Sequence, residues 1–274
     1  MRVSSSLVAY PAFCEVFLRI PTHFRHAGVV ILVALLIGST MLPHVYAPTV
    51  IVFDSVASTY CDICLTPLSW THTVGNGSSR ILMVGVSVNE ISVGVANVTY
   101  GSASLTRVAN LGLVAFYYLL NPAIGTGRVT VALTAMPGLA SGGSVSYFNV
   151  AGVGASSSSW GLGSVATVTV PSNVSDLVVD VLYAGTGTST TVGWNQTMRW
   201  AQFNGGAGSE KIATSNATAM TWILLGYEGP WRMIAAVLLP QTAIPEFPIG
   251  LPSSLLLVIL VVGYGLLRRS PRMD

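Results

Sequence analysis

The stretch Ser79-Arg80-Ile81-Leu82-Met83-Val84 indicates the fold class, because it is a short apolar run bounded by polar residues. A run of similar pattern, Ser175-Asp176-Leu177-Val178-Val179-Asp180, follows 96 residues later (79 to 175). Between them and beyond them, runs rich in Val, Thr, Ile and Tyr alternate with clusters of Gly, Ser, Asn and Pro. This alternation is typical of strands joined by turns, so it predicts an all-β chain.

From residue 48 to about residue 240 no helical period persists over two turns. Strands that start about every 8 to 14 residues are typical of an antiparallel sandwich or barrel. A body of this length is large enough for one substantial core. The expected strands are 49–54, 69–74, 81–88, 93–100, 105–108, 114–120, 128–134, 143–150, 165–170, 177–183, 197–203, 211–214, 219–226 and 232–239.

A second pair of runs also suggests a repeat. Leu105-Thr106-Arg107-Val108-Ala109 resembles Thr197-Met198-Arg199-Trp200-Ala201 at an offset of 92 (105 to 197). Two halves that arose by duplication would produce both pairs, but strands also resemble one another by composition alone. If the halves are real, the Gly- and Ser-rich segment 155–163 is the expected boundary between them.

The composition and charge of the chain argue against a nucleic-acid-binding protein. Hydrophobic residues make up 51% of the chain and charged residues only 8%, against a usual charged share of about 25%. Between residues 48 and 249 there are six basic and eight acidic residues, so the net charge of +2 belongs to the two ends. No basic patch suggests nucleic acid as a partner. A body rich in Gly, Ser, Thr and Val suits an extracellular β-protein.

Residues 1–47 are expected to form an export signal helix that is removed as a signal peptide. Basic residues precede an apolar run from Ala27 to Leu42, and Val45-Tyr46-Ala47 places a small residue at the cleavage point. An uncleaved anchor helix is the alternative.

The C-terminal end predicts a membrane anchor. A Pro-rich linker (241–249) leads into 250–267, which contains no charge and as a helix spans about 27 Å, close to the thickness of a bilayer core. Arg268 and Arg269 begin a basic tail (268–274), which favours a cytoplasmic C-terminus. The body is therefore expected at the cell surface, outside the cytoplasmic membrane.

The motif Pro245-Glu246-Phe247, followed by one hydrophobic helix and a small basic cluster, resembles the PEF-CTERM sorting tails of archaeal surface proteins. The resemblance covers about residues 244 to 272. It implies that a membrane-embedded archaeosortase cuts near the motif and transfers the protein to a lipid anchor, much as the tail of a GPI-anchored precursor is replaced. An ordinary single-pass anchor with a proline-rich stalk is the alternative.

The body resembles an uncharacterised module of prokaryotic secreted proteins across about residues 65 to 240. The stretches that carry this resemblance are Val98-Thr99-Tyr100-Gly101, Tyr117-Tyr118-Leu119-Leu120-Asn121-Pro122 and Asp176-Leu177-Val178-Val179-Asp180. The resemblance implies a jelly-roll-like sandwich on a surface protein and assigns no activity.

The mature body contains two cysteines, in Cys61-Asp62-Ile63-Cys64. A Cys-x-x-Cys pair can be redox-active, can supply half of a zinc site or can close a small disulfide loop. Outside the cell the disulfide is favoured. No cofactor or metal is expected.

No catalytic motif is present in the sequence. His72 is the only histidine of the mature body and is expected on a solvated sheet face. Asp176 and Asp180 lie four residues apart in one expected strand, so they are candidates for paired carboxylates or calcium ligands. The favoured interpretation instead pairs Asp180 with an arginine such as Arg199.

Aromatic residues are the better candidates for binding, because exposed rings stack on sugars. Trp200 and Trp222 are expected in the core. The candidates in Gly-rich loops are Trp160, Trp194, Tyr227 and Trp231, with closure of the sandwich ends as their alternative role. Five sequons predict a glycosylated exterior: Asn76, Asn97, Asn173, Asn195 and Asn216.

Together these features predict a non-catalytic, surface-anchored β-sandwich protein that serves envelope structure, adhesion or surface recognition. The alternatives are a lectin-like carbohydrate-binding module and, less favoured, a polysaccharide-acting enzyme. Expected partners are the membrane, an archaeosortase-like processing enzyme and glycans.

Overall fold

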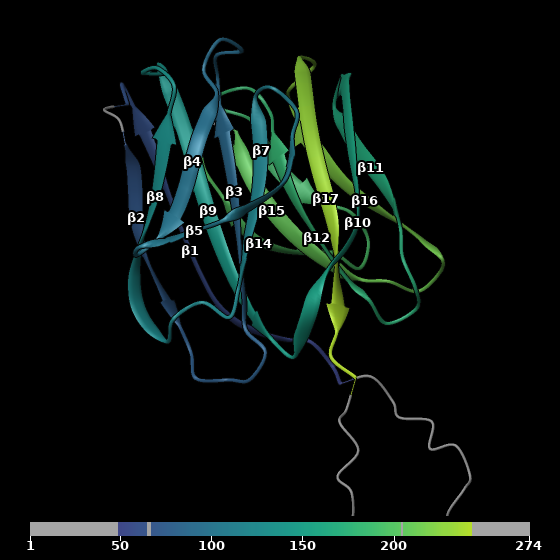
Figure 1. Ribbon diagram of the computed structural model, residues 1–274. Helices are drawn as coiled ribbons and strands as arrows, with labels where there is room; N and C mark the ends of the chain where they lie inside the picture. The colour runs from purple at the N-terminus through teal and green to yellow at the C-terminus, as the bar shows by residue number, and fades with distance from the viewer. Residues whose placement is uncertain (1–48, 65–66, 204, 243–274) are drawn as a thin grey trace, which may run out of the picture. The chain divides into compact units, whose positions relative to one another are not determined.

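A computed structural model of the protein describes residues 49–64, 67–203 and 205–242 (Figure 1). The predicted signal segment, the sorting motif, the C-terminal helix and the basic tail lie outside these residues. No helix in the described part has the length and apolarity that a membrane span requires.

The described residues form an all-β, antiparallel structure, which confirms the predicted fold class. The strands of the first half are β1 (Val52–Asp62), β2 (Leu68–Val74), β3 (Ile81–Val88), β4 (Val95–Tyr100), β5 (Ala103–Ser104), β6 (Thr106–Asn110), β7 (Val114–Leu120), β8 (Gly125–Leu133) and β9 (Leu139–Phe148). Those of the second half are β10 (Val150–Leu162), β11 (Val165–Pro171), β12 (Leu177–Tyr183), β13 (Ser189–Val192), β14 (Thr197–Ala201), β15 (Gly206–Ile212), β16 (Ala217–Leu225) and β17 (Pro230–Pro240).

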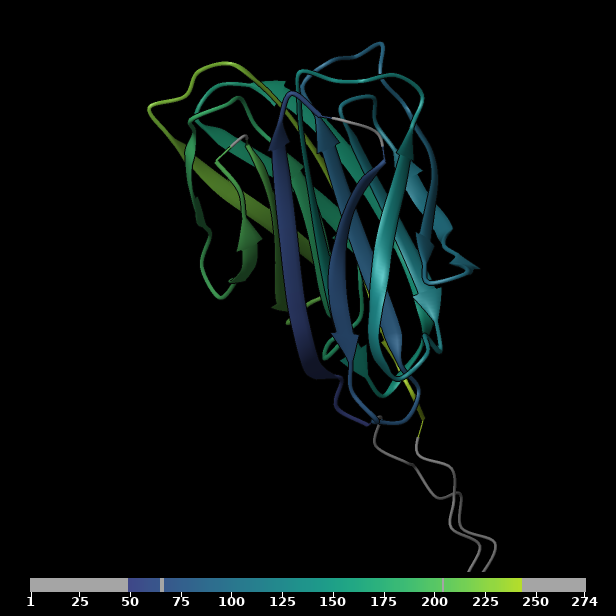
Figure 2. The ribbon, with the colours of Figure 1, turned by 90° about the vertical axis from the view of Figure 1, so that its left-hand side faces the viewer.

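Each half is a sandwich of two sheets. Inner sheet 1 has the order β1-β9-β3-β7-β6, and outer sheet 1 has the order β2-β8-β4-β5. Inner sheet 2 has the order β10-β17-β12-β15-β14, and outer sheet 2 has the order β11-β16-β13. The two inner sheets face each other, so the layers run outer sheet 1, inner sheet 1, inner sheet 2, outer sheet 2 (Figures 1 and 2).

The two halves repeat one strand order. In inner sheet 2, β10, β17, β12, β15 and β14 take the places that β1, β9, β3, β7 and β6 have in inner sheet 1. In the outer sheets β11, β16 and β13 correspond to β2, β8 and β4, and the short strand β5 has no counterpart. The edge strands repeat their irregularities as well. The β1–β9 register shifts after Phe53 and the β10–β17 register after Val153, while β6 and β14 each shift one residue against β7 and β15.

The predicted boundary at 155–163 is wrong, because Ser156–Ser159 lie inside β10, where they pair with β17. The strand order instead begins to repeat after Asn149, which separates β9 from β10. Asn149 has a φ of 63°, a left-handed conformation that asparagine tolerates better than most residues. Serine and glycine suggested a turn, but pairing with β17 overrides this local preference.

The inner sheets approach closely because glycines face the opposing sheet. A Cβ on Gly85 would lie 2.7 Å from Cγ2 of Val181, and one on Gly143 would overlap the indole of Trp200. Gly208, on β15 of inner sheet 2, leaves space for the same indole on its other side. Trp200 is thus inserted between backbone surfaces, as its predicted core position requires.

We expect Gly143→Ala to destabilise the protein by about 1–3 kcal/mol, because the added methyl group overlaps Trp200 and forces the inner sheets apart. Gly152→Ala is the matched control, since no heavy atom lies within 4 Å of a Cβ there. Urea unfolding followed by tryptophan fluorescence measures both. Equal stability of the two variants would contradict this account of the close approach.

Candidate functional site

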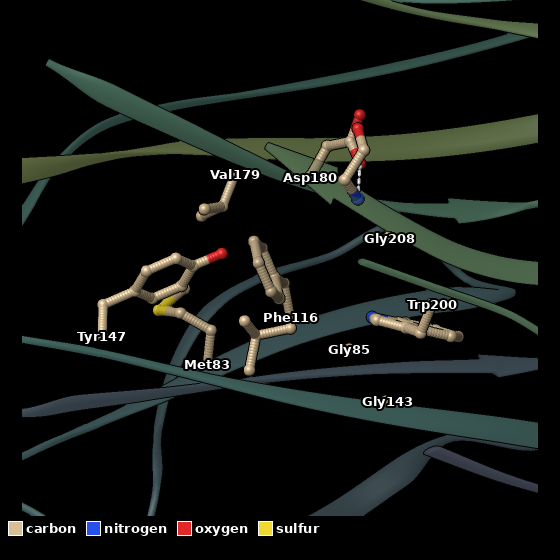
Figure 3. Close-up of a pocket in the computed structure, with 11 residues that line it drawn as sticks. Met83, Gly85, Phe116, Gly143, Tyr147, Val179, Asp180, Trp200 and Gly208 are labelled. Carbon is tan, nitrogen blue, oxygen red and sulfur yellow. Dashed lines mark hydrogen bonds between the residues drawn. The ribbon is translucent and has the colours of Figure 1, made fainter. Parts of the chain in front are cut away.

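The cavity between the inner sheets is a packing gap. It is lined by Met83, Phe116, Tyr147, Asp180 and Trp200, among others (Figure 3). Its volume is about 10 Å³, which is at the lower limit of the roughly 10–15 Å³ that a cavity needs to hold one water molecule. The seam between the halves therefore has no room for a ligand.

Asp180 lies beside this cavity and is fully enclosed. Its Oδ1 accepts hydrogen bonds from the backbone N–H and the hydroxyl of Ser209, at 2.8 and 2.9 Å, and its Oδ2 accepts one from Trp222 Nε1 at 3.0 Å. Burial raises the pKa of Asp180 to about 7, although these hydrogen bonds oppose the shift. The expected pairing of Asp180 with Arg199 is wrong, because Asp180 faces outer sheet 2.

Arg199 instead forms an ion pair with Glu210, one strand away. Its guanidinium lies 3.7 Å from the ring centroid of Phe53, and Tyr147 donates a 2.6 Å hydrogen bond to Glu210. Burial and the neighbouring Glu210 raise the pKa of Tyr147. Because Phe53 and Tyr147 belong to inner sheet 1, this cluster joins the two halves along one edge.

His72 is wrongly predicted as solvated, since it is only 1% exposed. In β2 the buried positions alternate from Leu68 through Trp70 and His72 to Val74, so the histidine points into the first sandwich. Its Nδ1 lies 2.8 Å from Ser144 Oγ and its Nε2 3.0 Å from Ser146 Oγ. Burial lowers the pKa of His72 to about 4, with the Asp54 carboxylate acting in the opposite direction.

The His72 group does not have the geometry of a catalytic triad. Asp54 accepts its hydrogen bond from Ser146, at 2.7 Å, and is not the group that orients the imidazole. Trp70 Nε1 donates to Ser144 Oγ, which also lies within hydrogen-bond distance of His72 Nδ1 and of the carbonyl oxygen of Ala57. Each polar atom of the imidazole is satisfied inside the core, as a structural histidine requires.

The two candidate carboxylates, Asp176 and Asp180, are also separated. Asp176 precedes β12 and accepts a 2.7 Å hydrogen bond from the backbone N–H of Asn173, whereas Asp180 lies in the core of the second sandwich. Asp176 lines an open cleft of about 330 Å³ together with Asn173, Asn216, Val237 and Leu239. Among the described residues no group of three or more His, Cys, Asp or Glu side chains could hold a metal ion.

Cys61 and Cys64 are joined by a disulfide at the end of β1. The loop that it closes holds Ile63 at a φ of 65°, a conformation in which a β-branched residue is unusual. Cys64 is buried and Ile63 is exposed.

The four candidate aromatics do not form one site. Trp160 and Trp194 are 69% and 86% exposed, but Trp160 lies in edge strand β10 and Trp194 follows β13, at the opposite edge of the second sandwich. Trp231 is only 6% exposed and packs over Gly161, and half-buried Tyr227 packs over Gly185 and donates to the carbonyl of Pro230. Trp160 and Trp231 are in strands, not in loops as predicted. Trp200 and Trp222 are buried, as predicted.

All five sequon asparagines are exposed. Asn76, Asn173 and Asn216 lie in the loops β2–β3, β11–β12 and β15–β16, which are at the same end as the β9–β10 connection. Asn97 is on the outer face of outer sheet 1, and Asn195 is in the β13–β14 connection. The loops at the other end of the sandwiches contain no sequon.

The buried side chains of His72 and Asp180 predict opposite pH dependences of stability. The pKa of His72 is below its ordinary 6.5, so its stabilising contribution is full above pH 6.5 and is lost as pH falls toward 4. The pKa of Asp180 is above its ordinary 3.8, so its contribution is full below about pH 4 and is lost as pH rises toward 7. Between pH 4.5 and 6.5 the two slopes cancel.

We therefore expect the unfolding free energy of Asp180→Asn to rise with pH by about 1.4 kcal/mol per unit in this window, and that of His72→Gln to fall by a similar amount. Urea titrations at several pH values measure each slope, with the unsubstituted protein as the reference. Parallel pH profiles for all three proteins would show that the two groups are not linked to folding in this way.

The sorting motif Pro245, Glu246 and Phe247 lies outside the described residues, so its role stays a prediction. No protein-family model and no curated protein matches this chain. The resemblances to PEF-CTERM tails and to the secreted module accordingly remain expectations from the sequence.

Proposed function

We propose that the protein is a non-catalytic, cell-surface-anchored β-sandwich protein that serves envelope structure, adhesion or surface recognition. The observation that carries this proposal is the meeting of the two ends of the body. The backbone N–H of Thr49 donates a 2.9 Å hydrogen bond to the carbonyl of Gln241, and its hydroxyl donates a second one at 2.6 Å.

This arrangement suits attachment at one end. The predicted membrane segment begins within ten residues of Gln241 (241 to 250), so the anchor would hold the body by the end where Thr49 and Gln241 lie. The loops that join β1 to β2, β8 to β9 and β16 to β17 lie at the other end and would face outward (Figure 1). Recognition by such a protein would use these outward loops and the sandwich edges near them.

The distribution of sequons supports an extracellular location. Each of the five asparagines has a side chain open to solvent, so a glycan could be attached without displacing core residues. Glycans would also supply the polar surface that a body with so few charges lacks. Their concentration at the attachment end would leave the outward end uncovered.

The finer fold assignment belongs to this proposal. We take each half to be a jelly roll, supported by a chain that crosses repeatedly between the inner and the outer sheet, with β4–β5, β6–β7 and β14–β15 as the consecutive strands that stay in one sheet. We take the halves to derive from a duplication. Jelly rolls occur in many surface and lectin domains, but the architecture alone assigns no activity.

A lectin-like carbohydrate-binding module is the second candidate, and the exposed indoles of Trp160 and Trp194 favour it. A polysaccharide-acting enzyme has less support, because Asp176 and Asp180 do not face a common cleft.

We expect the native protein to be accessible to protease on intact cells and its mature mass to lack residues 1–47. Deletion of residues 244–274 should release the body into the medium, because the anchor is lost while the described strands remain. Cell fractionation, protease shaving and intact-mass measurement test this. Recovery of the unprocessed chain from cytosol would overturn the proposal.

Sequon use can be tested at single positions. Asn173→Gln or Asn76→Gln should each lower the mass of the native protein by one glycan and leave the melting temperature within about 1–2 °C, because both side chains are exposed. Asn121→Gln, outside any sequon, is the control for mass. An unchanged glycan mass in all five Asn→Gln variants would show that the exterior is not glycosylated at these sites.

A further inference from the structure

A cross-strand row of three side chains lies on inner sheet 2 near the sequon-free end. Trp160 of β10 is directly opposite Arg232 of β17, and Arg232 is directly opposite Tyr183 of β12. Residues directly opposite in antiparallel strands point to the same face, with Cβ atoms about 4.5–5.5 Å apart. The three residues are therefore consecutive neighbours across the sheet, with their side chains on the same face.

Trp160 contributes little to the core. Its side chain is 69% exposed, whereas the next strand position places Trp231 over Gly161 on the opposite face, inside the second sandwich. The core at this end of β10 is thus already filled by Trp231. An indole left in solvent at a sheet edge is available to stack on a flat apolar surface.

Arg232 is half-buried and, within the described part of the chain, has neither a hydrogen bond nor an ion pair. The β6–β7 turn lies against it, since a Cβ on Gly112 would be 3.8 Å from Arg232 Nε. The charge of Arg232 lowers the pKa of Tyr183, against the larger upward effect of burial. Guanidinium groups that are partly removed from water usually have an anionic partner.

The nearby acids do not supply that partner. Glu90 accepts a 2.8 Å hydrogen bond from the backbone N–H of Gly138, and Glu228 lies against Gly163. The exposed side chain of Ile91 lies beside Gly112 and provides an apolar wall next to the guanidinium. The row therefore combines an aromatic platform, a cation without an acidic partner among the described residues, and an apolar boundary.

We propose that the solvent-accessible end of this row, Trp160 with Arg232, binds a uronic-acid residue of an acidic polysaccharide, while the buried Tyr183 ends the row inside the core. The apolar face of the pyranose ring would stack on Trp160, and its carboxylate would accept two parallel hydrogen bonds from the fork of Arg232. This inference rests on the proposed surface location, and it names a ligand class for recognition there. A body with six basic and eight acidic residues between positions 48 and 249 does not suit nucleic acid, which needs several phosphate contacts.

Trigalacturonate and its methyl ester, which keeps the ring and removes the charge, are suitable probes for calorimetric titration of the full-length protein in detergent. We expect the acid to bind at least tenfold more tightly than the ester. Trp160→Ala should weaken binding of both probes about tenfold or more. Arg232→Gln should weaken the acid to the level of the ester, and Arg232→Lys should recover part of the difference.

Trp194→Ala is the matched control, because it removes a more exposed indole at the opposite edge and should leave binding unchanged. Melting temperatures of all variants establish that each is folded. Equal affinity for acid and ester, or wild-type binding by both Trp160→Ala and Arg232→Gln, would overturn the site. Such a result on a protein that protease shaving places at the surface would refute this inference and leave the proposed function standing.

Discussion

The close contact of the two inner sheets is the constraint on which the rest of the structure depends. Glycines at positions 85, 143 and 208 remove side chains from the seam, and Trp200 fills the space between the backbones. Such a contact allows two sandwiches to share one continuous core, which extends from outer sheet 1 to the near face of inner sheet 2. A second cluster then fills the space under outer sheet 2. Neither half would bury its inner sheet without the other.

Two buried titratable side chains, one in each sandwich core, have polar atoms that are satisfied internally. His72 is held between Ser144 and Ser146, and Asp180 is held by Ser209 and Trp222. Both would ordinarily change charge between pH 3 and 8, and burial displaces each toward its neutral form. Since unsatisfied polar groups in a core are costly, these networks also fix the positions of the strands that carry them. The polar atoms of both residues form hydrogen bonds inside the cores, where they hold strands together, and neither side chain points into an open cleft.

The sequence predicted the strands whose apolar pattern is strong, and it failed where tertiary pairing decides the conformation. The central strands β3, β7 and β12 have the predicted bounds, because continuous apolar runs of this length are typical of buried strands. Strand β10 was missed because serine and glycine have low strand preference, and only its pairing with β17 makes it a strand. His72 was placed on the wrong face because alternation alone does not say which face is buried; the tryptophan two residues earlier was the available signal. Of the two residues of the proposed site, the sequence identified Trp160 as a candidate because it is aromatic. Arg232 could be connected to it only once the register of β10 and β17 was known.

The repeat of strand order shows how the proposed site differs from the equivalent place in the first half. There the corresponding row is Tyr60, Ser141 and Ser87, across β1, β9 and β3. The two serines are buried and hydrogen-bonded to each other at 2.7 Å, and Gly206 of the opposite sheet packs against them. In the second half the same positions hold Trp160, Arg232 and Tyr183, with the glycine-containing β6–β7 turn beside the arginine and the indole left in solvent. Two equivalent positions in the strand order thus have different chemistry: the serines of one join the halves, and the other places a half-buried arginine beside an exposed indole. Joining the halves explains the buried serine row without any ligand, but it does not explain why an exposed tryptophan lies beside an arginine that has no acidic partner in residues 49–64, 67–203 and 205–242.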